Sequence, residues 1–294
     1  MIKKFFTAVI AMMMTIGVSA QFYIYLSNGD VLQADSISVV APIEGTLRGE
    51  FSVSAMQKVH FSQGNLQYQA STNTWRFAEN QYDIIGDANS NISSTYTGWI
   101  DLFGWGTGSN PTLTSTNIID YKTFTDWGTN AISNGGNEAD VWRTLSKDEW
   151  VYLFYSRANA ATLFGLGSVN GVNGTILLPD NWILPADASF TASTTLGLVD
   201  QGHYYENPNN NNFSHNTYTA EQWVVMESAG AVFLPCAGGR NGTEVLSVGS
   251  NCLYRSSRSL LEAGIAYSLC FTSSILLPQG DTANFIGGSV RLVR

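Results

Sequence analysis

Charge is scarce in this chain. Only 13% of its 294 residues are Asp, Glu, Lys or Arg, about half the share in an average soluble protein. Coiled coils and long-helix proteins, which are rich in Glu, Lys and Arg, are therefore excluded, and so is disorder driven by charge. Acidic residues outnumber basic ones by 23 to 14, which gives a net charge of −9. Because nucleic acids bind basic surfaces, we expect no nucleic-acid partner.

Cysteine and histidine are also rare, with three residues of each. An odd number of cysteines leaves at least one unpaired unless it bonds another chain. The sequence has no CxxC pair and no Cys/His cluster, whereas structural zinc sites use closely spaced ligand pairs. We therefore expect no metal, no cofactor, and a fold held by its core and not by disulfides. The residues in question are Cys236, Cys252, Cys270, His60, His203 and His215.

The first twenty residues have the pattern of a secretory signal peptide. Lys3 and Lys4 precede an apolar run over 5–18, which is too short to cross a bilayer core of about 30 Å as a helix. Small residues at 18–20 then form a cleavage site before Gln21. We predict that residues 1–20 are removed as a signal peptide of the Gram-negative type and that the protein is secreted or displayed at the cell surface. No later run is long enough to form a transmembrane segment.

Two regions follow the predicted cleavage site. Residues 22–40 alternate loosely around Asn28-Gly29, a dipeptide that suits the two-residue turn of a β-hairpin. Together with a connector that contains Pro42, they form a short N-terminal segment, residues 21–50. No charged or Pro-rich linker interrupts the rest of the chain, so we predict one large domain over residues 51–294.

Helical patterns are confined to residues 146–157 and 219–230. Each segment opens with a capping box, in which two side chains bond the first free N–H groups of the helix. A tryptophan comes directly after each box and begins the expected buried face. The residues are Ser146, Glu149 and Trp150 in the first segment and Thr219, Gln222 and Trp223 in the second.

The rest of the predicted domain has the pattern of short strands joined by turns. A continuous apolar run at 231–238 predicts a buried strand, and Asn-Gly pairs predict turns. We expect an α+β protein with two helices on antiparallel, loop-rich sheets. The other expected strands are 59–69, 74–79, 266–274 and 288–294, and the expected Asn-Gly turns begin at Asn134, Asn170, Asn173 and Asn241.

Enzymatic chemistry finds little support in the residues. There is no GxSxG motif for a serine nucleophile, and no pair of facing carboxylates is evident for a glycosidase. We therefore predict no catalytic residues. A carbohydrate-binding module stays open as an alternative, because the polar tract 201–218 carries Tyr204, Tyr205 and Tyr218, side chains suited to stacking on a sugar ring.

Several phrases together resemble a known group of proteins. They are KVHFSQGNLQYQ, WIDLFGWGTG, WRTLSKDEW, ILLPDNW, AEQWVVMESAGAVFLPCAGGRNG and the terminal GGSVRLVR. The chain resembles the Fibrobacter succinogenes major paralogous domain group and its relatives in the formylglycine-generating-enzyme superfamily. The resemblance implies a C-type-lectin-like fold in which two helices flank a small sheet and long loops carry function. One member of that superfamily oxidises a sulfatase cysteine with copper-binding thiols, so a thiol or copper oxidase is a further alternative.

The C-terminal region is similar to the variable proteins of diversity-generating retroelements, in which fixed scaffold residues alternate with changing surface residues. The fixed residues match at Tyr254, Leu269 and Phe271, but Arg255 stands where tryptophan is expected. The resemblance implies a diversified ligand-binding surface over residues 252–286. The residues expected to contact ligand are Cys252, Leu253, Arg255, Arg258, Leu260, Leu261, Glu262, Ile265, Ser268, Cys270, Thr272 and Ile275.

Residue chemistry adds to this expectation. Alternation in the strand at 266–274 places Ser268, Cys270 and Thr272 on the face opposite Leu269 and Phe271, and one of the two faces belongs to the core. Apolar side chains beside arginines have the composition of a binding surface. We predict an adhesin-like or receptor-like protein whose ligand is a protein or glycan on another cell or surface, and whose segment 21–50 attaches it to a surface fibre. The alternative is an ordinary strand end with scattered exposed apolar residues.

Overall fold

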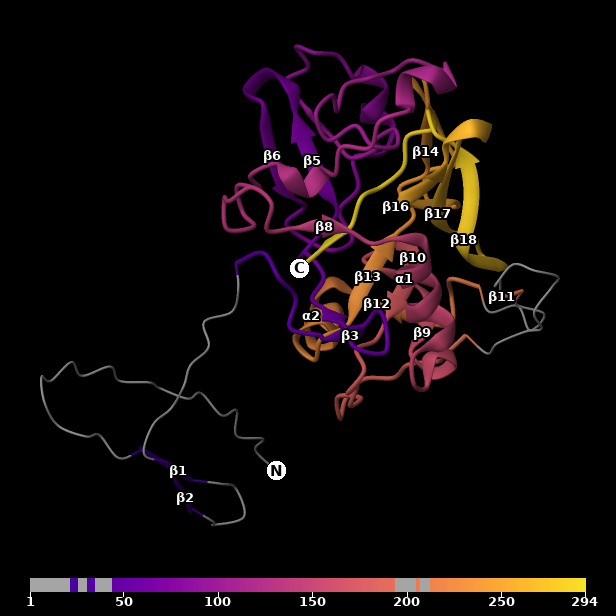
Figure 1. The fold of residues 1–294 in the computed structure, drawn as a ribbon. Coiled ribbons are helices and arrows are strands. Elements are labelled where there is room, and N and C mark those ends of the chain that lie inside the picture. Colours follow the sequence, from indigo (N-terminus) through magenta and orange to yellow (C-terminus); the bar gives the residue numbers. More distant parts are fainter. Residues whose placement is uncertain (1–21, 26–30, 35–43, 194–204, 207–211) are drawn as a thin grey trace, which may run out of the picture. The chain divides into compact units, whose positions relative to one another are not determined.

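The computed structural model describes residues 22–25, 31–34, 44–193, 205–206 and 212–294 (Figure 1). The chain divides into two compact units, Met1–Pro42 and Ile43–Arg294.

The first unit contains the predicted hairpin. Strands β1 (Phe22–Tyr25) and β2 (Val31–Ala34) pair antiparallel, with Tyr25 opposite Val31. The hairpin is therefore confirmed. Its turn at Asn28-Gly29 and the predicted signal peptide lie outside the described residues.

The second unit is mixed α+β and is built mostly from short antiparallel strands. The central sheet has the order β12-β9-β10-β13, with bounds Thr217–Tyr218, Phe164–Val169, Val172–Leu177 and Val232–Pro235. The C-terminal sheet has the order β11-β18-β17-β16, with bounds Tyr205–Glu206, Ile275–Ala283, Ile265–Phe271 and Cys252–Leu260. A third sheet has the order β6-β5-β7, with bounds Thr74–Phe77, Leu66–Gln69 and Trp99–Ile100.

Three two-stranded ladders complete the strands of this unit. They are β3 (Phe51–Ser52) with β4 (Lys58–Val59), β8 (Arg143–Thr144) with β19 (Leu292–Val293), and β14 (Gly239–Asn241) with β15 (Glu244–Leu246). Within the described part of the unit, the strand pairs named here are antiparallel except that β12 and β9 run parallel.

Both predicted helices are confirmed. Helix α1 (Lys147–Val151) and helix α2 (Ala220–Ser228) each begin at the predicted capping box. A single π-helical turn, Tyr152–Ser156, extends α1. Gly230 follows the C-cap Ala229 of helix α2, and its φ of +102° suits a residue without a Cβ. Short 3-10 helices η1, η2, η3, η4, η6 and η7 cover Ala70–Thr72, Gly86–Asn91, Ile118–Tyr121, Trp127–Thr129, Ala160–Thr162 and Leu261–Ala263.

The central sheet lies between the two helices. Leu234 of β13 packs in one core cluster with Trp150 of α1, and its neighbour Phe233 packs in another with Trp223 of α2. Because alternate side chains of a strand point to opposite faces, a strand covered on both faces must be apolar throughout. The continuous apolar run at 231–238 is thereby explained, and the buried strand β13 is confirmed.

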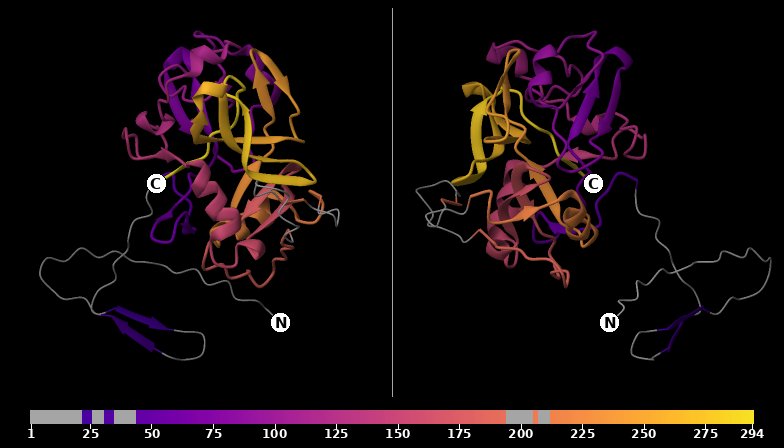
Figure 2. Two further views of the ribbon diagram at one scale, coloured as in Figure 1. Left: turned by 45° about the vertical axis from the view of Figure 1, so that its right-hand side comes forward. Right: turned by 180° about the vertical axis from the view of Figure 1, so that it is seen from behind.

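Helix α1 also contacts the C-terminal sheet. Trp150, Leu153 and Phe154 share their core cluster with Tyr254 of β16 and Leu269 of β17. Figure 2 shows β16, β17 and β18 side by side in both views, with α1 next to them. The face of the C-terminal sheet that carries Tyr254 and Leu269 is therefore buried.

The two ends of the second unit pair with each other. The N–H of His60 donates to the carbonyl of Arg294 at 2.9 Å, and the N–H of Arg294 donates back at 3.0 Å. The predicted strands there are shorter than expected: residues 59–69 divide between β4 and β5, and residues 288–294 contribute β19 alone.

The Asn-Gly turns have mixed outcomes. Asn170-Gly171 joins β9 to β10 with positive φ at both residues, as predicted. The turn at Asn173-Gly174 is wrong, because both residues lie inside β10 and pair with β9. The turn before β15 contains Gly242, whose φ is +61°, while Asn241 pairs with Glu244.

No helix among the described residues is long and apolar enough to span a membrane.

Candidate functional site

The C-terminal sheet carries a broad open groove of about 870 Å³. Nine of its fifteen lining residues lie between 252 and 286, the region in which a ligand surface is predicted. These nine residues are Leu253, Tyr267, Cys270, Leu277, Gln279, Gly280, Asp281, Thr282 and Ile286. The other six come from the start of α1 and from the chain between β13 and β16, and are Lys147, Gly238, Gly239, Leu246, Ser247 and Asn251.

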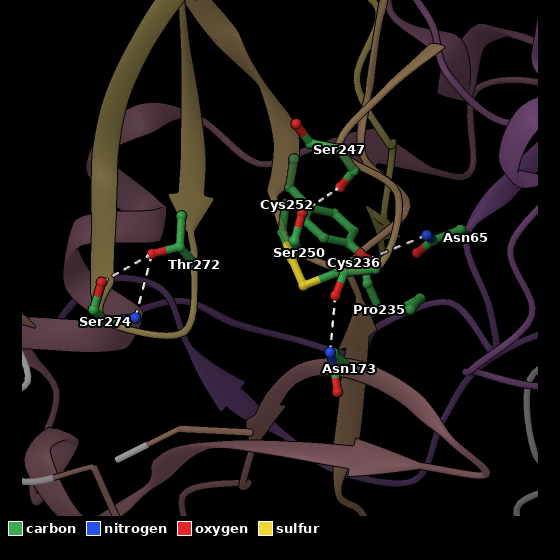
Figure 3. The surroundings of a disulfide bond; sticks show 11 residues. Asn65, Asn173, Pro235, Cys236, Ser247, Ser250, Cys252, Thr272 and Ser274 are labelled. Atoms are coloured by element: carbon green, nitrogen blue, oxygen red, sulfur yellow. Dashed lines mark hydrogen bonds between the residues drawn. A yellow bond between two sulfur atoms is a disulfide. The ribbon is translucent and has the colours of Figure 1, made fainter. Parts of the chain in front are cut away.

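The chain between β13 and β16 is held by a disulfide. Cys236 and Cys252 are bonded across a sequence separation of 16, and both are buried. Figure 3 shows the bond with Ser247 and Ser250 of the intervening chain beside it. The N–H of Gly238 also donates to the carbonyl of Asn251 at 3.0 Å. Both ends of this wall of the groove are therefore fixed to the body.

Cys252 is thus a structural residue, which corrects its prediction as a ligand contact. It lies opposite Phe271 across the β16–β17 pair, whereas its neighbour Leu253 lies opposite Cys270. Because adjacent residues of a strand point to opposite faces, the disulfide lies on the core side and Leu253 with Cys270 on the groove side. The expectation that the fold is held without disulfides is also wrong. Spacing along the chain does not show which sulfur atoms the fold brings together.

Cys270 is the free cysteine of the described residues. Burial raises the pKa of its thiol to about 12, although the guanidinium of Arg255 acts in the opposite direction. A thiol with so high a pKa is almost wholly protonated at neutral pH and is a weak nucleophile or metal ligand. The described residues contain no group of three or more His, Cys, Asp or Glu side chains placed to hold a metal ion.

Arg255 and Ser268 are fully buried, so their predicted exposure is wrong. The Nη1 atom of Arg255 donates to Ser268 Oγ at 3.3 Å and to Thr282 Oγ1 at 3.0 Å. Ser268 does lie on the opposite face from Leu269, but the guanidinium of Arg255 covers it. Alternation in a strand predicts which side chains share a face and not what covers that face.

The turn between β16 and β17 is exposed, as predicted. Arg258 and Glu262 are exposed, Leu260 and Leu261 are 48% and 40% exposed, and Ile265 is half-buried. We call these five residues the apex. They follow the same strands as the groove, since Ile265 is two residues from Tyr267 in β17.

A further segment lies beside the apex. Gly264 closes the turn with a φ of +65°, and an added Cβ there would meet Ile118 of η3 at 2.8 Å. Ile118 and its neighbour Ile119 are 39% and 60% exposed. Sequence patterns do not indicate this segment, because η3 reaches the apex through tertiary packing alone.

The opposite end of the sheet holds the last two predicted residues. Thr272 lies in the tight turn between β17 and β18, where its N–H donates to the carbonyl of Ile275 at 2.8 Å. Ile275 is 37% exposed and pairs with Glu206 of β11. Thr272 and Ile275 are accessible, but they do not line the groove and are not part of the apex.

One cation and one carboxylate lie at the surface of the groove. Lys147 Nζ is placed over the ring of Tyr267, 4.8 Å from its centre. Asp281 lies opposite Tyr267 in the β17–β18 pair. The groove therefore offers an aromatic ring, two opposite charges and apolar side chains, a combination typical of ligand sites. Lys147 was not predicted as a site residue, because it belongs to a helix to which no function was assigned.

The alternative site at 201–218 is not assembled as expected. Tyr218 is buried, its ring lies 5.8 Å from that of Trp223, and its hydroxyl donates to the carbonyl of Ser189. Burial raises its pKa to about 12. Its prediction as a sugar-stacking residue is therefore wrong. Tyr204 lies outside the described residues, as does the side chain of Tyr205.

Comparison of the chain with protein-family models, with curated proteins and with solved structures finds no match in any of the three.

Proposed function

We propose that this protein is a ligand-binding protein, not an enzyme, and that its binding surface is the groove of the C-terminal sheet together with the apex. The groove carries this proposal, because a cavity of about 870 Å³ is large enough for a peptide or oligosaccharide segment. The residues of the apex extend the same strands, so one ligand can contact both.

A protein is the favoured partner. The apex combines two adjacent exposed leucines with Arg258 and Glu262, and an exposed apolar patch rimmed by charged residues is typical of an interaction site. Arginine and tyrosine are enriched at the energetic centre of protein interfaces, and the groove contributes Tyr267. A glycan is the second candidate ligand, and the experiment below distinguishes the two.

We further propose that the second unit has a C-type-lectin-like fold of the formylglycine-generating-enzyme type, with region 252–286 diversified as in retroelement variable proteins. Two helices on either side of a sheet are in keeping with that fold. Sequencing the same locus in sibling strains tests the second part. Changes concentrated at the apex, with Tyr254 and Leu269 constant, are expected; changes spread evenly along the chain would contradict it.

Export and attachment complete the proposal. We propose that residues 1–20 direct export and that residues 21–50 attach the protein to a surface fibre. The N-terminal sequence of the exported protein is expected to begin at Gln21. Deletion of residues 21–42, which spares the second unit, is expected to release the protein into the medium, and retention at the cell surface would contradict the attachment role.

The binding role is tested on arrays of cell-surface proteins and glycans with matched variants. Leu260→Ala with Leu261→Ala, and separately Tyr267→Ala, are expected to weaken binding to protein spots at least about tenfold. The control is Val224→Ala with Val225→Ala, a second pair of adjacent exposed residues that lies on α2. Equal effects of both leucine and valine pairs would contradict the proposal. Binding confined to glycan spots would establish the second candidate.

A further inference from the structure

Two buried guanidinium groups lie beside the groove. Arg240 and Arg255 are 1% and 0% exposed. Charged side chains are seldom fully buried without a partner of opposite charge. The groups that surround these two arginines therefore decide how much positive charge is left uncompensated near the ligand surface.

Arg255 has neutral partners throughout. Its guanidinium donates to the hydroxyls of Ser268 and Thr282 and, at 3.3 Å, to the carbonyl of Ala283. Its Nε atom has no acceptor in the described part of the chain. Burial lowers its pKa to about 10, so the group stays charged at neutral pH.

Arg240 is similar. It donates to three backbone carbonyls, those of Leu102, Leu113 and Gly242. Neither arginine takes part in any ion pair among the described residues. Two positive charges are therefore buried in one region, in a protein whose net charge is −9.

Arg255 adjoins the groove, because Thr282, which accepts a hydrogen bond from it, is itself a lining residue. Arg240 lies behind the lining. Its neighbour Gly239 lines the groove, but adjacent residues of a strand point to opposite faces, and its guanidinium donates to Leu102 and Leu113 instead.

The lining itself is balanced in charge. Lys147 is its one cationic residue and Asp281 its one carboxylate. Arg255 therefore adds a positive charge beside a lining that is otherwise neutral, and a poorly solvated charge acts over a longer range than an exposed one. The potential in the groove is therefore expected to be positive.

Apolar side chains complete the lining. Leu246, Leu253, Leu277 and Ile286 all face the groove. We propose that the groove takes a carboxylate carried on an apolar stem, as found at the free end of a peptide with an aliphatic last residue. This inference rests on the proposed binding role of the groove and names the class of ligand.

Three small probes test it by NMR titration of the full chain. Acetyl-leucine carries both features, acetyl-leucinamide lacks the charge, and glucuronate carries the charge on a polar ring. The signals to follow are the amides of Gly239 and 280–283 and the Nε–H of Arg255. Acetyl-leucine is expected to give saturating shifts there, with a dissociation constant at least about tenfold lower than either other probe.

The three probes test the carboxylate and the apolar stem separately. Equal affinity for acetyl-leucinamide would overturn the requirement for charge. Equal affinity for glucuronate would overturn the apolar stem and point to an acidic sugar. Absence of saturating shifts with any probe would overturn the ligand class, while array binding that depends on Leu260 and Tyr267 would still support the proposed function.

Variants add a second readout. Arg255→Met, which removes the charge at similar volume, is expected to weaken acetyl-leucine binding at least about tenfold. Arg48→Met, at an exposed position outside both the groove and the apex, is expected to leave it unchanged. If Arg255→Met does not fold, the comparison of the three probes on the unaltered protein still decides the question.

Discussion

Gln81 and Arg291, 210 residues apart in the sequence, are joined by a hydrogen bond of 2.8 Å from Arg291 Nη2 to Gln81 Oε1. The same oxygen accepts from the N–H of Phe233 at 2.6 Å, and Gln81 Nε2 donates to the carbonyl of Ala231 and to Glu227. One buried amide therefore joins the edge of the central sheet, helix α2 and the C-terminal segment.

Replacing this amide is expected to be costly. Gln81→Leu leaves the N–H of Phe233 and the guanidinium of Arg291 short of partners in the interior. We expect a loss of about 3 kcal/mol or more in the free energy of unfolding, measured by urea titration. Gln57→Leu, at an exposed position, serves as the control and is expected to change stability by less than about 0.5 kcal/mol. Equal effects of the two variants would contradict the role of Gln81.

Trp150 and Trp223 separate the scaffold from the ligand surface. Both are buried, at 0% and 1% exposure, so alanine at either position is expected to cost about 3–5 kcal/mol. Arg258→Ala and Leu260→Ala, at the apex, are expected to cost about 0.5 kcal/mol or less. Thermal melts in which the two apex variants lose more stability than the two tryptophan variants would contradict this assignment of scaffold and ligand surface.

The disulfide between Cys236 and Cys252 closes a loop that forms one wall of the groove. Its removal by Cys236→Ser with Cys252→Ser is expected to cost about 3 kcal/mol, because the unfolded chain gains freedom. Cys270→Ser is the matched control, since that thiol is free. The apolar clusters on both faces of the central sheet remain, so the double variant is still expected to fold at 25 °C. Complete unfolding there would contradict a fold whose main support is its core.

Asp101 gives the fold a dependence on pH. Burial raises its pKa to about 6, while hydrogen bonds from the N–H of Ile85 and from Asn89 act in the opposite direction. In an unfolded chain its pKa is about 3.9. The folded state thus holds the proton more tightly, so the stabilisation from Asp101 is complete below about pH 4 and is lost as the pH rises through 6.

Asp101→Asn removes this titration. The stability of the unaltered protein relative to the variant is expected to fall by roughly 3 kcal/mol between pH 4 and pH 7, measured by urea titration at each pH. Asp87→Asn, at an exposed position, is expected to show no such trend. A difference that stays constant or grows with pH would contradict the raised pKa.

Cys270 is expected to react slowly with thiol reagents. Its pKa of about 12 leaves little thiolate at pH 8, so its reaction with a disulfide reagent is expected to be at least about a hundredfold slower than that of free cysteine. Reaction at the rate of free cysteine would show that the thiol is exposed and ionised.

Local patterns predicted the local structure. Each capping box involves residues only three positions apart, so Ser146 with Glu149 and Thr219 with Gln222 indicate where the helices begin. The continuous apolar run likewise predicted β13. The dipeptide Asn170-Gly171 predicted the turn between β9 and β10.

The candidate site depends on contacts between distant parts of the chain, and sequence patterns do not show these. The strand pattern placed Ser268 on a free face, but Arg255, thirteen residues earlier, covers it. The groove needs Lys147 and the loop closed by Cys236 in addition to the strands. The exposure of the apex was predicted from local composition, apolar side chains beside arginines, and not from a turn, since strand β16 was not predicted.

Hydrogen exchange with a bound partner tests the central claim most directly. With the protein that binds most strongly on the array, slowed exchange is expected in residues 246–282, which include the apex and most of the groove, and none in β9 and β10 of the central sheet. Protection of β9 and β10 with no change in 246–282 would show that the ligand binds elsewhere and would contradict the account.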